Sequence, residues 1–220
     1  MILMRGTVRT RPDLAANIRR IESHVAGGFD ERLLEKIPTK DELDRALISA
    51  ANQGELEKVR SLIDQGADPG HGNKVGMRAI DCARIHDYYR VVEFLEKTAN
   101  KNMFSAIKND NFEKFKKALD AGANPNAKTK SGMPILTNAV GLQRIRMTEL
   151  LVEKGADVNM MSSSEHTPLM MAVIVADLKL VKFLVGKEAD PDRENKYMVS
   201  AKSLAITHGH IAISNCLENK

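Results

Sequence analysis

The stretch from Leu150 to Ala172, LLVEKGADVNMMSSSEHTPLMMA, contains the features that decide the fold. It begins with the apolar end of a helix, and Gly155 follows where a helix needs a left-handed residue just past its last turn. The polar residues after it favour a tight turn. Thr167 can cap the next helix, and Pro168 suits the first helical position because no N–H is needed there. The stretch therefore predicts a helix end, a loop that turns back, and a new helix.

Related turns recur at a fixed spacing, which indicates a repeat architecture. Gly122 in DAGANPN lies 33 residues before Gly155, and Glu188 in GKEADPD lies 33 residues after it. Gly66 in DQGADPG is followed, again 33 residues later, by Ala99 in KTANK. Only 23 residues separate Ala99 from Gly122, so one unit is ten residues short.

The GAD turn, the loop after it and the helix start TPLMMA together resemble the junction between two ankyrin repeats, in which the typical sequence of the helix start is TPLHLA. The resemblance covers roughly 41–220. It implies an all-α solenoid of about six degenerate ankyrin repeats, each a helix-turn-helix with a β-hairpin loop, called a finger below. We expect the repeats at 41–73, 74–99, 100–129, 130–162, 163–195 and 196–220.

Residues 1–40 precede the repeats and are predicted to form a basic arm and an N-terminal helical cap. The segment PDLAANIRRIESHVAGG places apolar residues on one helical face, and FDERLLEKI predicts a second short helix. A solenoid needs its exposed end covered, which favours a cap over 12–37. A separate targeting or partner-binding arm is the alternative.

The short unit, KNMFSAIKNDNFEKFKKALDAGANPN, has no room for a finger, because Asn100 to Met103 cannot reach a finger tip and return. One interpretation is a gap in the row of fingers. The other is a break between two sub-stacks, 41–99 and 100–220. In both cases this place is the expected weak seam or hinge. The fifth repeat has Glu188 where Gly is wanted, which costs about 1 kcal/mol if the left-handed conformation is kept, unless Gly186 ends the helix early.

The composition indicates a globular protein, with 43% hydrophobic and 28% charged residues. The formal net charge of +4 does not by itself indicate a nucleic-acid partner. Lysines and arginines of repeats three and four are interrupted by acidic neighbours and lack aromatic residues for base stacking, which favours a solvated face. An acidic protein partner or a lipid headgroup is the alternative. The apolar runs are too short to span a bilayer, and the N-terminus has the wrong charge order for a secretory signal. We expect a cytoplasmic protein.

The sequence contains no GxGxxG, P-loop, GxSxG, HExxH or CxxC motif, so we expect no catalysis and no cofactor. Cys82 and Cys216 fall in different repeats and are interpreted as free thiols in a reducing compartment. His208 and His210 lie in an HGH turn, and a zinc site would need three or four convergent ligands, so no metal is expected.

Apolar residues also occupy positions that need not be core. The family resemblance implies a partner on the concave side, touched by the fingers and by residues just before the turn between the two helices of a repeat. Met133, Leu142, Ile174 and Val175 fall at such places, and clustered exposed apolar groups mark interaction sites. Packing between adjacent repeats is the alternative. The predicted partner-binding residues are Met77, Ile85, Lys130, Met133, Leu142, His166, Ile174, Val175, Tyr197 and Val199.

The resemblance implies a non-catalytic, monomeric protein–protein interaction module that binds an extended or helical segment of a protein partner on the concave surface, with no nucleic acid and no membrane as partner. The alternative is a secreted effector of an intracellular microbe, or a targeting or accessory subunit, that uses the array to engage host or substrate proteins. Asn126 and Asn159 lie in sequences that resemble those around asparagines hydroxylated in some ankyrin proteins; ordinary turn-forming asparagines are the alternative.

Overall fold

A computed structural model describes residues 38–218 of the 220-residue chain. Within that range the chain forms eleven α-helices, and its only β pairing is isolated antiparallel bridges at two of the fingers. The predicted helical cap over 12–37 lies outside the described residues. The helices are α2 (Lys40–Asn52), α3 (Leu56–Gln65), α4 (Ala79–Ile85), α5 (Tyr89–Lys108), α6 (Phe112–Asp120), α7 (Ile135–Gly141), α8 (Ile145–Glu153), α9 (Pro168–Ile174), α10 (Leu178–Gly186), α11 (Ala201–Thr207) and α12 (Ile211–Glu218).

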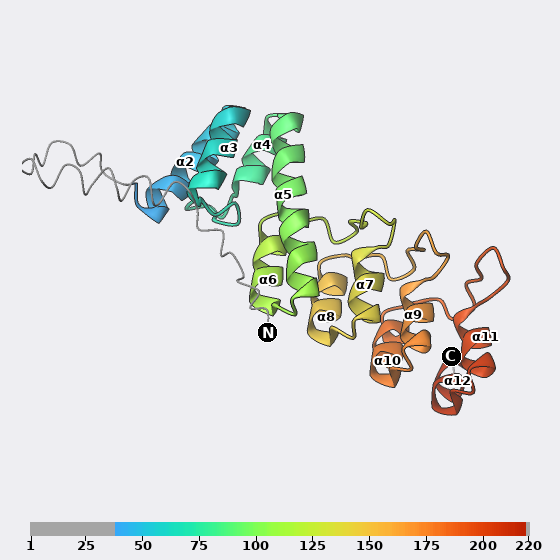
Figure 1. Ribbon diagram of the computed structural model, residues 1–220. Helices are drawn as coiled ribbons and strands as arrows, with labels where there is room; N and C mark the ends of the chain where they lie inside the picture. The colour runs from blue at the N-terminus through green and yellow to red at the C-terminus, as the bar shows by residue number, and fades with distance from the viewer. Residues whose placement is uncertain (1–37, 219–220) are drawn as a thin grey trace, which may run out of the picture. The chain divides into compact units, whose positions relative to one another are not determined.

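The helices pack in successive pairs, and each pair packs on the next (Figure 1). Within pairs, α2 contacts α3, α7 contacts α8, α9 contacts α10, and α11 contacts α12. Between pairs, α7, α9 and α11 form one layer, while α6 contacts α8 and α10 contacts α12 in the other. The predicted all-α solenoid is confirmed, and its division into six repeats stays a prediction.

The local features of the stretch 150–172 adopt the predicted conformations. Gly155 has a φ of 88°, in the left-handed region, just past the end of α8. The hydroxyl of Thr167 accepts a hydrogen bond from the backbone N–H of Met170 at 3.2 Å, and Pro168 is the first residue of α9. A helix end and a helix start are thus set by their own residues.

Each turn between the two helices of a pair contains one residue with positive φ, which gives a common register for the whole array. These turn residues are Gly54, Asp87, Asp110, Gln143, Ala176 and Gly209. Successive members are 33 residues apart, except for the 23 residues from Asp87 to Asp110. The shortened unit of the sequence is therefore located between these two turns.

The four fingers share one hydrogen-bonding pattern. In each finger the N–H of the first residue donates to the carbonyl of the fifth, at 2.8 to 3.0 Å, and the fourth residue has positive φ. The fingers are 73–77, 129–133, 162–166 and 195–199. Gly76 and Gly132 supply the left-handed residue in the first two, whereas Glu165 and Met198 supply it in the others.

Two asparagine side chains join the loops of successive pairs. The carbonyl oxygen of the Asn126 side chain accepts from the N–H of Asp157 at 2.8 Å, and its amide donates to the carbonyl of Gly155 at 3.1 Å. Asn159 repeats this arrangement one pair later, with the N–H of Asp190 at 2.8 Å and the carbonyl of Glu188 at 3.3 Å. Both side-chain amides therefore satisfy backbone groups of the next loop.

A single helix runs through the place where the finger is missing. Helix α5 is 20 residues long, and the predicted repeat boundary between 99 and 100 falls inside it. Its first part pairs with α4 and its last part pairs with α6. Within the described residues there is thus a gap in the row of fingers, as predicted, and it is filled by continuous helix.

The hydrophobic core nevertheless divides along α5. One cluster of buried side chains extends from α2 to Leu95, and the next begins at Ala99. A third cluster follows, mainly over α9 to α12. The second and third clusters both pack against the partly buried side chain of Val158, whereas no partly buried side chain packs against both the first and the second cluster. We call the part of the array before this division the first stack and the part from Ala99 onward the second stack.

A lysine marks the beginning of each stack. The position four residues after the turn residue holds a side chain no more than 3% exposed in four pairs, namely Val91, Met147, Leu180 and Ile213. In the other two pairs this position is exposed and holds Lys58, in the first pair of the first stack, and Lys114, in the first pair of the second. The sub-stack interpretation of the sequence agrees with this pattern, because an end that faces water needs polar residues.

We expect the substitution Asn159→Ala to lower the free energy of unfolding by about 1 kcal/mol. It removes the side-chain hydrogen bonds to the N–H of Asp190 and to the carbonyl of Glu188. Urea denaturation followed by circular dichroism measures the change. Asn52→Ala is the control, since the Asn52 side chain is exposed and makes no hydrogen bond with the described residues. Equal losses in the two variants would contradict the joining role of Asn159.

Glu188 keeps the left-handed conformation, with a φ of 65°, and α10 ends at Gly186. We therefore expect Glu188→Gly to raise the free energy of unfolding by about 1 kcal/mol, because glycine adopts positive φ without the clash of a Cβ atom. Gly155→Ala at the equivalent turn, where no atom lies near the added Cβ, should lower it by a similar amount. Unchanged thermal midpoints for both variants would show that these turns relax.

Candidate protein-binding surface

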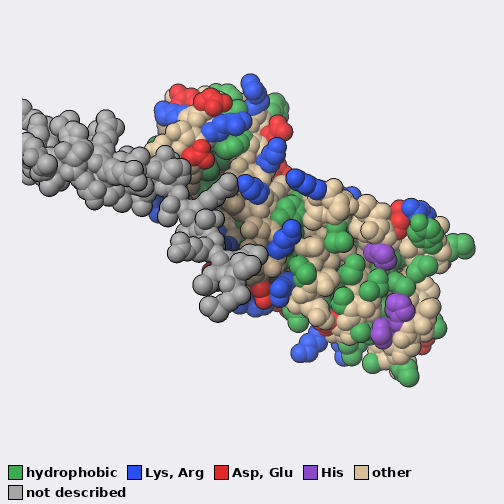
Figure 2. Space-filling view, viewed as in Figure 1, with side chains coloured by type: hydrophobic (Ala, Val, Ile, Leu, Met, Phe, Trp, Pro, Cys, Tyr) green, Lys and Arg blue, Asp and Glu red, His purple; other side chains and the backbone are tan. Residues whose placement is uncertain are grey.

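Partly exposed apolar side chains lie on, or directly after, the first helices of three successive pairs, α7, α9 and α11. Leu142 is 40% exposed and Ile174 is 38% exposed, and the other members are half-buried. Figure 2 shows hydrophobic side chains spread over the part of the molecule that α7 to α12 occupy. We call the set the apolar strip; it consists of Leu142, Met171, Ile174, Val175 and Leu204.

A glycine allows two neighbouring pairs to approach closely within the strip. A Cβ atom on Gly141 would lie 3.4 Å from both Cγ and Sδ of Met171, so the methionine side chain lies across the glycine. The sequence analysis missed Met171 and Leu204. The spacing of Met171, Ile174 and Val175 at i, i+3 and i+4 could have indicated Met171, because such residues share one helix face.

Four of the predicted binding residues occupy one equivalent position, the fifth residue of a finger. They are Met77, Met133, His166 and Val199. Each accepts the finger-closing hydrogen bond through its backbone carbonyl, and each side chain is half-buried. These residues therefore hold the finger base together and present only part of the side chain.

Two further predicted residues lie at finger tips. Tyr197 is 67% exposed, and the ammonium of Lys196 lies 5.2 Å from the centre of its ring. Lys130 is exposed in the second finger. Neighbouring fingers are joined, because Asn195 donates to the carbonyl of Glu165 and Ser163 donates to the carbonyl of Ser131. Apolar side chains are also exposed at the tips, since Val75 in the first finger and Met198 beside Tyr197 are each 77% exposed.

Ile85 is separated from the apolar strip by the junction of the two stacks. It is 64% exposed at the end of α4, in the position that Ile174 takes in α9. The intervening helix α5 has Lys108 at this position, followed by Asn109. The structure therefore brings Leu142, Ile174 and Val175 together and places Ile85 on the other side of a polar segment.

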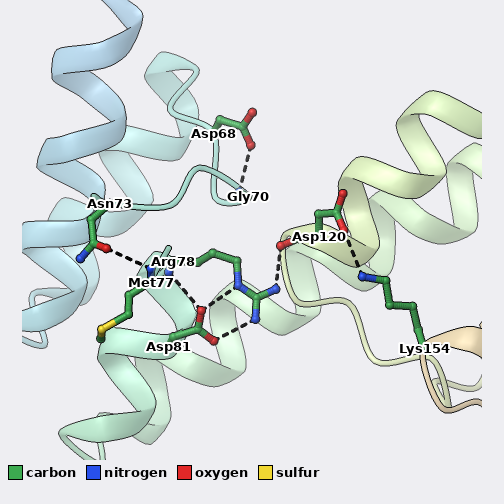
Figure 3. Close-up of polar contacts among 8 residues, drawn as sticks. All are labelled: Asp68, Gly70, Asn73, Met77, Arg78, Asp81, Asp120 and Lys154. Atoms are coloured by element: carbon green, nitrogen blue, oxygen red, sulfur yellow. Dashed lines mark hydrogen bonds and ion pairs between the residues drawn. The ribbon is translucent and has the colours of Figure 1, made fainter. Parts of the chain in front are cut away.

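The junction is held by Arg78 (Figure 3). Its guanidinium donates to both carboxylate oxygens of Asp81, at 2.7 and 2.8 Å, and to the backbone carbonyl of Asp120 at 2.7 Å. The carboxylate of Asp120 in turn lies 3.4 Å from the ammonium of Lys154. Arg78 belongs to the first stack and Asp120 to the second, so this arginine connects them.

Close backbone packing accompanies this contact. A Cβ atom on Gly70 would lie 3.4 Å from the backbone nitrogen of Ala121, and one on Gly122 would lie 2.9 Å from the side chain of Ile80. Because the finger between these two pairs is absent, the end of α6 packs directly on the first stack. The side chain of Asn100 replaces the missing loop contact by accepting from the N–H of Asn124 at 2.8 Å.

The described residues contain no group of three or more His, Cys, Asp or Glu side chains that could hold a metal ion. The rings of His208 and His210 lie 5.7 Å apart at the last turn. Cys82 is buried, and this burial raises the pKa of its thiol. None of the helices between residues 38 and 218 is long and apolar enough to cross a membrane.

Comparison with known proteins agrees with the repeated turns, the fingers and the stacked pairs. The family profile described as ankyrin repeats in three copies matches residues 103–195. The chain carries ankyrin repeats. It is 30% identical over 151 residues to the zebrafish ankyrin repeat and SAM domain-containing protein 6. The aligned region covers 68% of this chain and 18% of that protein.

Two further relatives differ in how much of their own length aligns with this chain. The putative ankyrin repeat protein YahD of Escherichia coli is 26% identical over an alignment of 184 residues. The alignment covers 76% of this chain and 92% of YahD. The human cyclin-dependent kinase 4 inhibitor B is 42% identical over 59 residues, which are 27% of this chain and 42% of that protein. Ankyrin repeats generally mediate protein–protein interaction, and the family is generally non-catalytic.

We expect Arg78→Met to lower the free energy of unfolding by about 2 kcal/mol at neutral pH, because hydrogen bonds from a charged donor are lost. The hydrogen bond from Arg78 holds the pKa of the Asp81 carboxyl below its usual value of 3.8. Stability from this pair is therefore present above that value and disappears as the pH falls through the lowered pKa. The difference between variant and wild type should shrink below pH 3.8.

Urea denaturation at several pH values measures this effect. Arg90→Met serves as the control, since Arg90 is exposed near the start of α5, in the same helix pair, and forms no ion pair with the described residues. A loss for Arg78→Met that stays constant from neutral to acid pH would exclude the carboxylate of Asp81 as its cause.

Proposed function

We propose that this protein recognises a protein partner on the face formed by the first helices and the fingers of the second stack, and that the apolar strip anchors the partner. The observation that carries the proposal is the partial exposure of Leu142 and Ile174 beside three half-buried apolar side chains on successive helices. Binding is favourable when a partner covers grouped apolar side chains, because this removes their surface from water.

The surroundings of the strip suit recognition rather than simple aggregation. The fingers of the second stack carry Lys130 and Tyr197 at exposed tips, together with the exposed Met198. Lys108 and Asn109 close the strip at the junction. Interfaces typically combine a small apolar centre with a polar rim, and a few central side chains supply most of the affinity.

The shape of the strip favours an elongated ligand. Its members come from three parallel first helices, so a bound segment must cross several pairs to cover them all. An extended segment or an amphipathic helix, with apolar residues on one side, fits this requirement. Met171 adds a flexible, polarizable side chain that adapts to different partner surfaces.

The similar kinase inhibitor supports binding of a protein partner by such repeats, since its name describes action on a cyclin-dependent kinase. A role as an effector or as a targeting subunit would use the same surface, and the arm that distinguishes it, residues 1–37, lies outside the described residues.

The test is a pull-down from a lysate of the source cells, quantified by mass spectrometry. The double variant Leu142→Asp/Ile174→Asp should lose the main bound protein by tenfold or more, because two carboxylates at the centre of an apolar contact would be desolvated without a partner, and tenfold is about 1.4 kcal/mol.

Ile85→Asp is the matched control, because Ile85 occupies the position equivalent to Ile174 but lies in the first stack. Circular dichroism verifies that each variant is folded. Equal recovery of the same protein with wild type and with the folded double variant would refute the apolar strip as the binding site.

A further inference from the structure

A polar groove lies at the junction of the two stacks. It has a volume of about 410 Å³ and lies between Asp68 and Pro69 of the first stack and the first helix pair of the second. The side chains that line it on α5 and α6 and in the turn between them are mainly amides, a hydroxyl and ammonium groups. The polar members are Asn102, Ser105, Asn109, Asn111, Lys114 and Lys117.

The groove exists because the second stack begins with a water-facing surface. At the position of Lys114 the later pairs carry Met147 and Leu180, each at most 2% exposed against the preceding pair. At the position of Asn102 the next pair carries Ile135, which is 0% exposed. The first stack therefore does not cover this surface as one ankyrin pair covers the next, and polar side chains line the space that is left.

Two lysines, Lys114 and Lys117, and one carboxylate, that of Asp68, line the groove, so its lining carries a net positive charge. Residues 97–117 contain six lysines and two acidic residues, Asp110 and Glu113. None of the six lysines forms an ion pair with any residue in the range 38–218.

The carboxylates closest to the groove already have partners. Asp110 forms an ion pair with Arg144 at 2.8 Å. Asp68 lies 3.6 Å from the ammonium of Lys40, and its side chain accepts from the N–H of Gly70 at 2.9 Å. Because Lys114 and Lys117 have no carboxylate partner within 38–218, they can bind an anion from outside, and the amides of Asn102 and Asn109 supply additional donors.

We propose that this groove binds an acidic segment of a protein partner, with carboxylates of the segment at Lys114 and Lys117 and its backbone carbonyls at Asn102 and Asn109. The proposal shares with the proposed function only the premise that the ligand is a protein, and it uses a different surface. A nucleic acid fits less well, because among the described residues that line the groove none is aromatic, and bases bind chiefly by stacking.

The probe is a short fluorescent peptide of alternating Glu and Gly, titrated with the full chain and followed by fluorescence anisotropy at low and high salt. We expect binding that weakens with salt. The double variant Lys114→Glu/Lys117→Glu should weaken it by about tenfold, since two attractions become repulsions inside the groove.

The matched control is Lys101→Glu/Lys116→Glu, which changes the net charge by the same amount within the same lysine-rich segment but outside the lining of the groove. It should weaken peptide binding only about threefold or less. Equal weakening by both double variants would mean diffuse attraction by the whole segment and would overturn the proposal.

Two further arms separate other ligands. If inorganic phosphate displaces the peptide at equal concentration, the groove takes small anions and the proposal fails. If a single-stranded DNA oligonucleotide binds more tightly than the peptide and is weakened by the same lysine substitutions, the ligand class is wrong.

Nuclear magnetic resonance makes the test independent of variant folding. The side-chain amide signals of Asn102 and Asn109 in the wild type should shift on addition of peptide, whereas that of Asn138 in α7 should not. Unshifted groove amides would overturn the proposal. The Leu142→Asp/Ile174→Asp variant should bind the peptide as the wild type does, so failure of the apolar strip and failure of the groove are distinguishable.

Discussion

The structure depends on one constraint, that a helix pair of this size buries its apolar face only against the next pair. Phe115, Leu151 and Leu184 are all 0% exposed, although each lies on a helix of only nine residues. Such short helices are marginal alone, so the free energy comes from burial between pairs. Every other feature follows from where this stacking is continuous and where it is interrupted.

The interruption at α5 explains two surfaces that look unrelated in the sequence. Between α7 and α12 stacking is continuous, side chains between pairs are apolar, and some of them extend to the edge as the apolar strip. At the junction the first pair of the second stack has the polar surface of an end, with Lys114 where its neighbours bury Met147 and Leu180. Continuous stacking of pairs thus gives the apolar strip, and the interruption of stacking gives the basic groove.

The junction is connected by polar contacts rather than by a shared core. Arg78 reaches the carbonyl of Asp120, and glycines at 70 and 122 permit close backbone approach. A hydrogen bond requires a particular distance and direction between donor and acceptor. Arg78 therefore fixes where the end of α6 lies on the first stack, although the two hydrophobic clusters share no common neighbour.

The sequence by itself determined the features that depend on local backbone chemistry. Gly155 past a helix end and Thr167 and Pro168 at a helix start act within a few neighbours, so their conformations could be predicted. The period of 33 and the unit that is ten residues short can be counted directly in the sequence. The tertiary structure alone decided that α5 is continuous, that Met171 packs across Gly141 of the preceding pair, and that Lys114 lines an open groove. The exposure of these side chains depends on which distant helix packs against them, and the residues on either side in the sequence do not contain that information.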